Sequence, residues 1–222
     1  MDLYFSPLAC SMATRVALYE AGADARFVEV DPDLKRTLEG GHDFRAVNPL
    51  GLVPTLRTDD GVVLTENAAI LQWVAERFPR ANLGSNDALE RARLQQWLCF
   101  IGTELHKGLF APLLSKKAPE GAKSYALETY LRRLDYLDAH LTGREFLLDH
   151  FSVADAYLAT VLNWTSVTPV DLKKWPAIAA YHQRIHARPS FARAFSEERV
   201  LYGQELSRQA ARAKAAQAAQ PA

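Results

Sequence analysis

The chain has 222 residues, 49% of them hydrophobic, so it is long enough for one large domain or two small ones. Its 26 basic and 26 acidic residues cancel, which argues against a nucleic-acid-binding protein and against binding to an anionic membrane. No apolar run approaches the roughly 20 residues that span a bilayer, and the N-terminus does not resemble a signal peptide. Two cysteines, Cys10 and Cys99, are too few for a disulfide framework, so we predict a reducing, cytoplasmic setting.

Residues 1–81 mix short strands with helices. Apolar patterning predicts strands at 3–5, 27–30, 55–57 and 62–64, and helices at 11–21 and 66–78. Two strands joined by a crossover helix are expected to be parallel, and the Asp60-Gly61 pair indicates that an antiparallel hairpin follows. The polar segment 32–48 is expected to be a loop with a short helix.

A short polar linker precedes residues 87–205, which are expected to be almost entirely helical. Asp87, with Glu90 three residues later, resembles the capping box that opens a helix. Apolar stripes at helical spacing, which must be buried against one another in a bundle, lie within 94–105, 127–141, 153–164 and 178–185. The Ala- and Gln-rich end of the chain offers little to pack, so we expect a disordered tail at 206–222.

Cys10 follows the first predicted strand and stands at the start of the first helix, in the segment Ser6–Ser11. The partial positive charge of a helix N-terminus favours a thiolate, which is the reactive form of cysteine. A small, inert, buried side chain is an equally good interpretation of these residues alone. The absence of a Cys-x-x-Cys motif argues against a disulfide-exchange enzyme with a resolving cysteine.

Two further segments suggest a binding site for a peptide-like molecule. In Asn48–Leu56, a cis Val53-Pro54 bond would leave the backbone of Val53 open to pair with an extended peptide, although a trans bond is more common. Glu66 and Asn67 begin a helix and could hold an ammonium and a carboxylate together. Simple helix capping explains the second segment equally well.

Taken together, these segments resemble the cytosolic glutathione S-transferases. Residues 103–108, Thr-Glu-Leu-His-Lys-Gly, are similar to a second-domain motif of the bacterial beta class, and residues 151–157 resemble the capping motif of the family. In that motif Ser152 is expected to be an N-cap and Asp155 a structural, not a catalytic, residue. The resemblance covers about residues 1–200 and implies an α/β thioredoxin-like N-terminal domain followed by an all-α helical-bundle domain.

The resemblance implies glutathione as co-substrate, with Cys10 and His106 as catalytic residues. The glutathione-binding residues that it implies are Cys10, Lys35, Val53, Pro54, Glu66, Asn67, Thr103, Glu104, His106 and Lys107. Arg36 is an alternative to Lys35, and Ser11 is an alternative to Cys10 as the activating residue. Cys99 stands where beta-class members often carry Asn, which puts a glutathione contact across the dimer in doubt.

The function implied is that of a homodimeric, cytoplasmic detoxification enzyme that joins the glutathione sulfur to a hydrophobic electrophile. Thiol–disulfide exchange through a Cys10–glutathione mixed disulfide is a further implied reaction. A glutathione-dependent isomerase or dehalogenase, or a non-enzymatic binding or regulatory protein, are the alternatives. The electrophile is expected near Leu109, Leu113 and Trp164.

No metal is expected. His182 and His186 are four residues apart on a predicted helix, a spacing that can bind zinc. Arginines surround them and the sequence offers no evident third ligand, so we interpret them as part of a solvated helix face.

Overall fold

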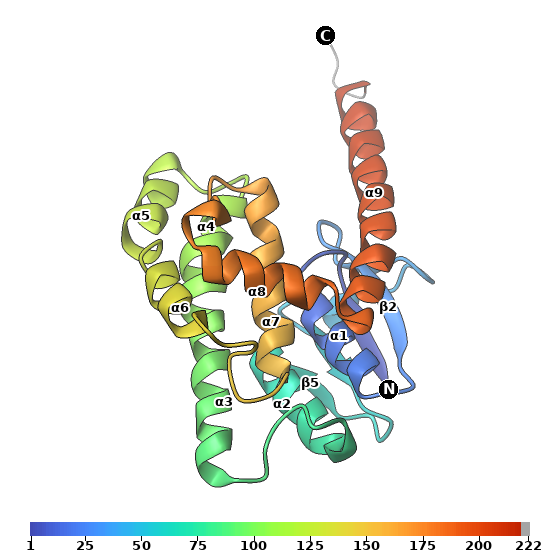
Figure 1. Ribbon diagram of the computed structural model, residues 1–222. Helices are drawn as coiled ribbons and strands as arrows, with labels where there is room; N and C mark the ends of the chain where they lie inside the picture. The colour runs from blue at the N-terminus through green and yellow to red at the C-terminus, as the bar shows by residue number, and fades with distance from the viewer. Residues whose placement is uncertain (219–222) are drawn as a thin grey trace.

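The computed structural model describes residues 1–218. A five-stranded sheet with its helices forms the N-terminal part, and the described chain after it is helical (Figure 1). The fold class expected from the sequence, thioredoxin-like followed by all-helical, is confirmed. Within residues 1–218, no helix is both long and apolar enough to cross a membrane.

The sheet has the strand order β3-β2-β1-β4-β5. Its strands are β1 (Asp2–Phe5), β2 (Arg26–Asp31), β3 (Arg36–Thr37), β4 (Thr55–Arg57) and β5 (Val63–Thr65). Strand β1 pairs in parallel with β2 because α1 (Met12–Glu20) connects them as a crossover, whereas β4 pairs antiparallel with β1 and β5. The predicted hairpin is present: Gly61, with a φ of 84°, donates its N–H to the carbonyl of Thr58 at 3.0 Å.

The segment between β2 and the hairpin contains more structure than the sequence predicted. Strand β3 adds an antiparallel edge to the sheet beside β2. The short helix expected here is a single turn at Phe44–Ala46, which Asp43 caps by accepting a hydrogen bond from the N–H of Arg45 at 3.0 Å. Its Phe44 is fully buried, so this loop is fixed against the sheet.

The helical part surrounds one buried helix. Its helices are α3 (Ala88–Phe100), a π-helical segment (Ile101–Phe110), α4 (Ala111–Leu114), α5 (Glu120–Tyr130), α6 (Arg133–Leu141), α7 (Val153–Leu162), α8 (Pro176–His186) and α9 (Pro189–Ala218). Every residue of α7 is buried, which explains why all of them except Asp155 and Thr160 are apolar or aromatic. The sequence pattern did not distinguish the π-helical turns from an ordinary continuation of α3.

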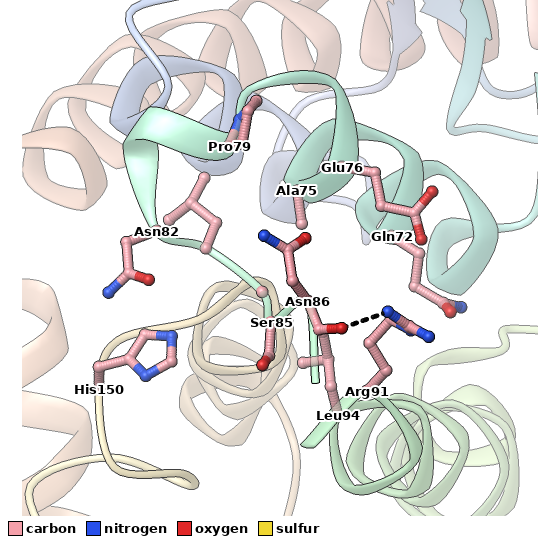
Figure 2. A pocket seen from close by; sticks show the side chains of 12 residues that line it. Gln72, Ala75, Glu76, Pro79, Asn82, Ser85, Asn86, Arg91, Leu94 and His150 are labelled. Carbon is pink, nitrogen blue, oxygen red and sulfur yellow. Dashed lines mark hydrogen bonds between the residues drawn. The ribbon is translucent and has the colours of Figure 1, made fainter. Parts of the chain in front are cut away.

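The linker between the two parts runs from α2 (Asn67–Arg77) to α3 and lines a small cavity of about 170 Å³ (Figure 2). Asp87 caps α3 as predicted, accepting hydrogen bonds from the N–H groups of Leu89 at 2.9 Å and Glu90 at 3.0 Å. The side chain of Glu90 pairs with Arg93 at 2.8 Å, so the capping box is only half formed. This cavity contains none of the predicted site residues.

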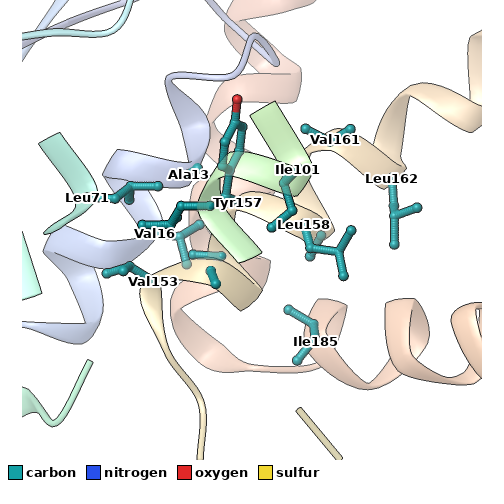
Figure 3. Packing of buried hydrophobic residues seen from close by; sticks show 14 of the residues in the cluster. Ala13, Val16, Leu71, Ile101, Val153, Tyr157, Leu158, Val161, Leu162 and Ile185 are labelled. Atoms are coloured by element: carbon teal, nitrogen blue, oxygen red, sulfur yellow. The ribbon is translucent and has the colours of Figure 1, made fainter. Parts of the chain in front are cut away.

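A single apolar core joins the sheet to the helices. Figure 3 shows Val16 of α1 and Leu71 of α2 packed around the same space as Ile101 and Leu158 from the helical part. All four side chains are fully buried. The relative position of the two parts is therefore set by close packing, and a site built from both has a fixed geometry.

The motif around Ser152 is structural, as predicted. The Asp155 carboxylate is fully buried and accepts hydrogen bonds from the N–H and the hydroxyl of Ser152, both at 2.9 Å. It also accepts from the N–H of Leu147 and the hydroxyl of Tyr181, again at 2.9 Å. These four donors hold the start of α7 to the chain on either side of it.

The disordered tail expected at 206–222 is wrong for residues 206–218, which continue α9; residues 219–222 lie outside the described part. Helix α9 projects beyond the rest of the molecule in Figure 1. Ion pairs join this part of α9, which lacks large apolar side chains, to the region of β2: Arg208 pairs with Glu29, and Arg212 pairs with Asp31 and Asp33. The sequence pattern could not reveal these pairs, because their members lie about 180 residues apart.

Candidate active site

A cavity of about 650 Å³ lies where the N-terminal part meets α3, the π-helical segment and α7. It brings together most of the residues implied by the sequence. These are Cys10, Lys35, Val53, Pro54, Glu66, Asn67, Thr103, His106 and Lys107. Glu104 does not line the cavity, because its carboxylate pairs with Arg133 at 2.7 Å.

Cys10 forms part of the cavity wall in a protonated form. Its Sγ lies 3.4 Å from the carbonyl oxygen of Val53, to which the thiol donates. Burial raises the pKa of Cys10 to about 11, with Glu66 raising it further and Lys107 opposing the change. Of the two interpretations of Cys10 that the sequence left open, the structure favours the protonated side chain: α1 begins only at Met12, and its N-terminus does not offset the loss of solvation at the sulfur.

Ser11, the alternative activating residue, faces away from this cavity. It is fully buried, its hydroxyl donates to the carbonyl of Ser6 at 3.2 Å, and it accepts from the N–H of Ser6 at 3.3 Å. Both bonds close the turn between β1 and α1. This side chain shapes the loop that carries Cys10 and does not reach the cavity.

The Val53-Pro54 bond is cis, and β4 begins directly after it. Asn48 stabilises this segment, since its amide donates to the carbonyl of Leu52 at 2.9 Å and to the hydroxyl of Thr55 at 3.1 Å. Val53 itself lies outside the strand pairing and lines the cavity.

Glu66 and Asn67 have different roles at the start of α2. Glu66 is exposed at the cavity and has a φ of 65°, a strained backbone conformation of the kind that clusters at binding sites. Asn67 is buried; its amide nitrogen donates to the carbonyl of Cys10 at 3.1 Å and its oxygen accepts from Thr14 at 3.0 Å. The Asn67 side chain thus joins α2 to α1, and the donors left for a ligand are the N–H groups of the first helical turn.

Lys35, and not Arg36, lines the cavity. Lys35 has a φ of 55°, and its methylene groups lie beside Gly51, where an added Cβ would be 3.4 Å from the lysine Cδ. Arg36 belongs to β3 and donates to the carbonyl of Gly41 at 3.4 Å. Of these two neighbouring cations, only Lys35 is therefore placed to contact a ligand in the cavity.

His106 reaches the cavity from the π-helical segment, together with Thr103 and Lys107. Burial, with a smaller contribution from Lys107, lowers the pKa of His106 to about 4, so the ring is neutral at physiological pH. Its Nδ1 lies 2.7 Å from the hydroxyl of Tyr157 on α7. Tyr157 belongs to an apolar stripe in the sequence, so no chemical role was predicted for it.

The residues proposed for a second substrate lie differently from the prediction. Leu109 is fully buried, and none of Leu109, Leu113 and Trp164 lines the cavity. The Trp164 indole instead donates to the carbonyl of Leu8 at 3.0 Å, and its ring centroid lies 5.0 Å from that of His106. Trp164 therefore contacts both the loop that carries Cys10 and the His106 ring, without lining the cavity itself.

Cys99 and the histidine pair complete the set of sequence candidates. Cys99 is exposed, lines the cavity and, like Cys10, is not in a disulfide. His182 and His186 are partly buried and share the side-chain oxygen of Asn163, so a solvated helix face was the wrong description. Residues 1–218 contain no group of three or more side chains placed to hold a metal ion.

Two family models match the chain. The model for the glutathione S-transferase N-terminal domain matches residues 9–77, and the model for the C-terminal domain matches residues 97–189. The chain belongs to the glutathione S-transferase family. Glutathione S-transferase GstA of Escherichia coli O157:H7 is 40% identical over 200 residues, which cover 89% of this chain and 98% of that protein.

Solved glutathione S-transferases also match closely. A sphingomonad enzyme complexed with glutathione has a TM-score of 0.85 and 42% identity, covering 89% of this chain and 98% of the other. The bacterial beta class enzyme of Sphingomonas chungbukensis gives the same four values. The predicted resemblance to the bacterial beta class is thereby confirmed, and this chain is a glutathione S-transferase close to that class.

Proposed function

We propose that this glutathione S-transferase joins the sulfur of glutathione to hydrophobic electrophiles in the cavity that contains Cys10. The observation that carries the proposal is the combination of charges along that cavity. Lys35 and Lys107 are cations suited to carboxylates, and Glu66 is an anion suited to an ammonium. Glutathione carries two carboxylates, one ammonium and one thiol, so its charged groups match those of the cavity.

The backbone supplies the remaining contacts in this proposal. Val53 offers its N–H and carbonyl to the cysteinyl part of glutathione, as an added strand would use them. The first N–H groups of α2 hold the γ-glutamyl carboxylate, because a helix N-terminus favours an anion. The glutathione complex of the sphingomonad relative supports this ligand for the chain.

Conjugation is favoured over thiol–disulfide exchange by the state of Cys10. Exchange begins when a cysteine thiolate attacks oxidised glutathione, forming a mixed disulfide and releasing one glutathione thiolate. A thiol with a pKa of about 11 is almost fully protonated at neutral pH and makes this attack slow. We retain the homodimer and the cytoplasmic setting as parts of the proposal.

Calorimetric titration with reduced glutathione tests the site. Glu66→Ala removes a charged partner of the ammonium, so its Kd is expected to rise about tenfold or more. Glu128→Ala, which removes an exposed glutamate on α5 outside the cavity, is the matched control and is expected to bind like the wild type. Cys10→Ala is expected to keep binding, because its thiol already bonds to Val53.

Three results would change the conclusion. Wild-type protein without saturable glutathione binding would favour a non-enzymatic protein on this fold. Binding without turnover of aryl halides, but with turnover of one isomerisable or dehalogenated metabolite, would favour the glutathione-dependent isomerase or dehalogenase. Equal Kd values for Glu66→Ala and Glu128→Ala would remove Glu66 from the site.

A further inference from the structure

Tyr157 places a hydroxyl group in the cavity from a rigid support. Its ring belongs to the core that joins the two parts of the molecule, and Figure 3 shows it beside Ala13 and Ile101 with its oxygen pointing away from the apolar cluster. Only 3% of the residue is exposed, yet it lines the same cavity as Cys10. A planar ring fixed in a packed core holds its hydroxyl in one place.

The Tyr157 hydroxyl keeps its proton. Burial raises the pKa of Tyr157 far above its ordinary value; the Asn67 side chain opposes this change and the Glu66 carboxylate adds to it. His106 is neutral and Lys107 is the neighbouring cation, so no strong base faces the hydroxyl. Tyr157 is therefore a hydrogen-bond donor throughout the physiological pH range.

Three other hydroxyl and thiol donors at the cavity are already engaged. The Ser6 hydroxyl donates to the carbonyl of Val30 at 2.8 Å, and the Thr103 hydroxyl donates to that of Cys99 at 3.0 Å. The Cys10 thiol donates to Val53. Each of these groups has a single hydrogen, so none of the three has one left for a ligand.

His106 can leave the hydrogen of Tyr157 free. A neutral imidazole carries one N–H, and with that proton on Nδ1 the ring donates to the Tyr157 oxygen across the 2.7 Å contact. The tyrosine O–H then points to another acceptor. A hydrogen bond accepted by the phenol oxygen also makes its O–H a stronger donor.

We propose that Tyr157 is a catalytic residue whose hydroxyl donates a hydrogen bond to the glutathione sulfur, with His106 as the positioning residue that orients it. This inference rests on the proposed glutathione site. In the reaction, the glutathione thiol releases its proton to water, and Tyr157 keeps its own. The sulfur lone pair then forms the bond to the electrophilic carbon, and the leaving group departs with its bonding electrons.

The test is the ionisation of bound glutathione in Tyr157→Phe, which keeps the ring and removes only the hydroxyl. Ultraviolet absorbance of the thiolate, followed against pH in protein saturated with glutathione, gives the apparent pKa of the bound thiol. Loss of one hydrogen bond to a charged sulfur is expected to lower the ionised fraction at neutral pH about tenfold, with kcat falling by a similar factor. Glutathione affinity measured below the thiol pKa is expected to change little.

Tyr19→Phe is the matched control. It also removes a partly buried tyrosine hydroxyl, one that donates to Glu197 and does not line the cavity. It is expected to leave the bound thiol pKa unchanged. His106→Ala is expected to raise that pKa in the wild-type background but not in the Tyr157→Phe background, because the two side chains act as one unit.

The outcomes separate this inference from the proposed function. Tyr157→Phe that binds glutathione and has the wild-type thiol pKa would overturn the inference, even if kcat fell, and would leave the glutathione site intact. Wild-type protein that does not bind glutathione would overturn the proposed function and this inference with it. A raised thiol pKa in Tyr157→Phe, absent from Tyr19→Phe, is the result expected.

Discussion

Glu198→Ala is expected to lower the unfolding free energy by more than an alanine substitution at any exposed ion pair of this protein would. Glu198 lies on α9 and is fully buried. Its Oε2 accepts from the N–H of Leu8 at 2.7 Å, and its Oε1 lies 3.2 Å from the Nε of Arg15, whose side chain is 4% exposed. One carboxyl therefore connects α9, α1 and the loop that carries Cys10.

The cost of Glu198→Ala follows from the two groups that it leaves without a partner. The buried N–H of Leu8 loses its acceptor, and the buried guanidinium of Arg15 loses its nearest carboxyl. Burial raises the pKa of Glu198 to about 8, so its carboxyl is mostly protonated at neutral pH, and the cost is that of the two buried donors left unsatisfied, about 3–5 kcal/mol of unfolding free energy together. For a chain of this length, that corresponds to a fall in Tm of roughly 6–20 °C.

Urea unfolding and thermal scans of Glu198→Ala beside Glu197→Ala measure this difference. Glu197 is the adjacent residue, pairs with Arg15 at 3.4 Å and with Arg193 at 2.9 Å, and its side chain is 39% exposed. Its replacement is expected to cost about 1 kcal/mol or less, because solvent screens the pairs. A loss below about 1 kcal/mol for Glu198→Ala would refute the reasoning, since Arg15 would then be satisfied by its other contacts.

Two further variants probe buried groups elsewhere. Burial lowers the pKa of His182 from 6.5 to about 4, so the stability that its neutral form contributes is full above pH 6.5 and is lost as the pH falls toward 4. In urea titrations, His182→Gln, which can still donate to Asn163, is expected to make the unfolding free energy fall less steeply with pH over that range. An unchanged pH dependence would contradict the burial argument. In Gly108→Ala, the new Cβ would lie 2.5 Å from the Tyr130 ring and 2.9 Å from the carbonyl oxygen of Thr103. The unfolding free energy is therefore expected to fall by about 2 kcal/mol or more. A Tm equal to that of the wild type would show instead that the π-helical segment shifts to accommodate the methyl group.

The features that the sequence predicted well depend on neighbouring residues. The Asp60-Gly61 turn and the Asp87 cap are decided within a few residues, and the structure contains both. Apolar spacing likewise located the buried faces of α3, α7 and α8, because burial has to recur with the period of the helix, but it predicted no such face for α9 and missed Ala126, the buried residue of α5. The residues of the site were found for a different reason, namely the order and spacing of family motifs.

The features that the sequence did not predict depend on distant partners. Asn67 has the amide expected of a ligand, but Thr14 and the carbonyl of Cys10 occupy it. Tyr157 has the position of a core residue, and only the approach of His106 from another segment gives its hydroxyl a chemical role. Helix α9 continues to Ala218 although it lacks apolar residues near its end, because acidic residues on and after β2 face its arginines.

The state of Cys10 shows how magnitudes decide between two sound arguments. A helix N-terminus stabilises a nearby anion by about 0.3–1 kcal/mol, which lowers a pKa by less than about one unit. Loss of solvation raises the pKa of the partly buried Cys10 thiol from 9.0 to about 11, so it outweighs the helix at this thiol. Because Cys10 and Tyr157 both keep their protons, the thiolate in our proposal belongs to glutathione, and these two side chains act there as neutral neighbours of the reacting sulfur.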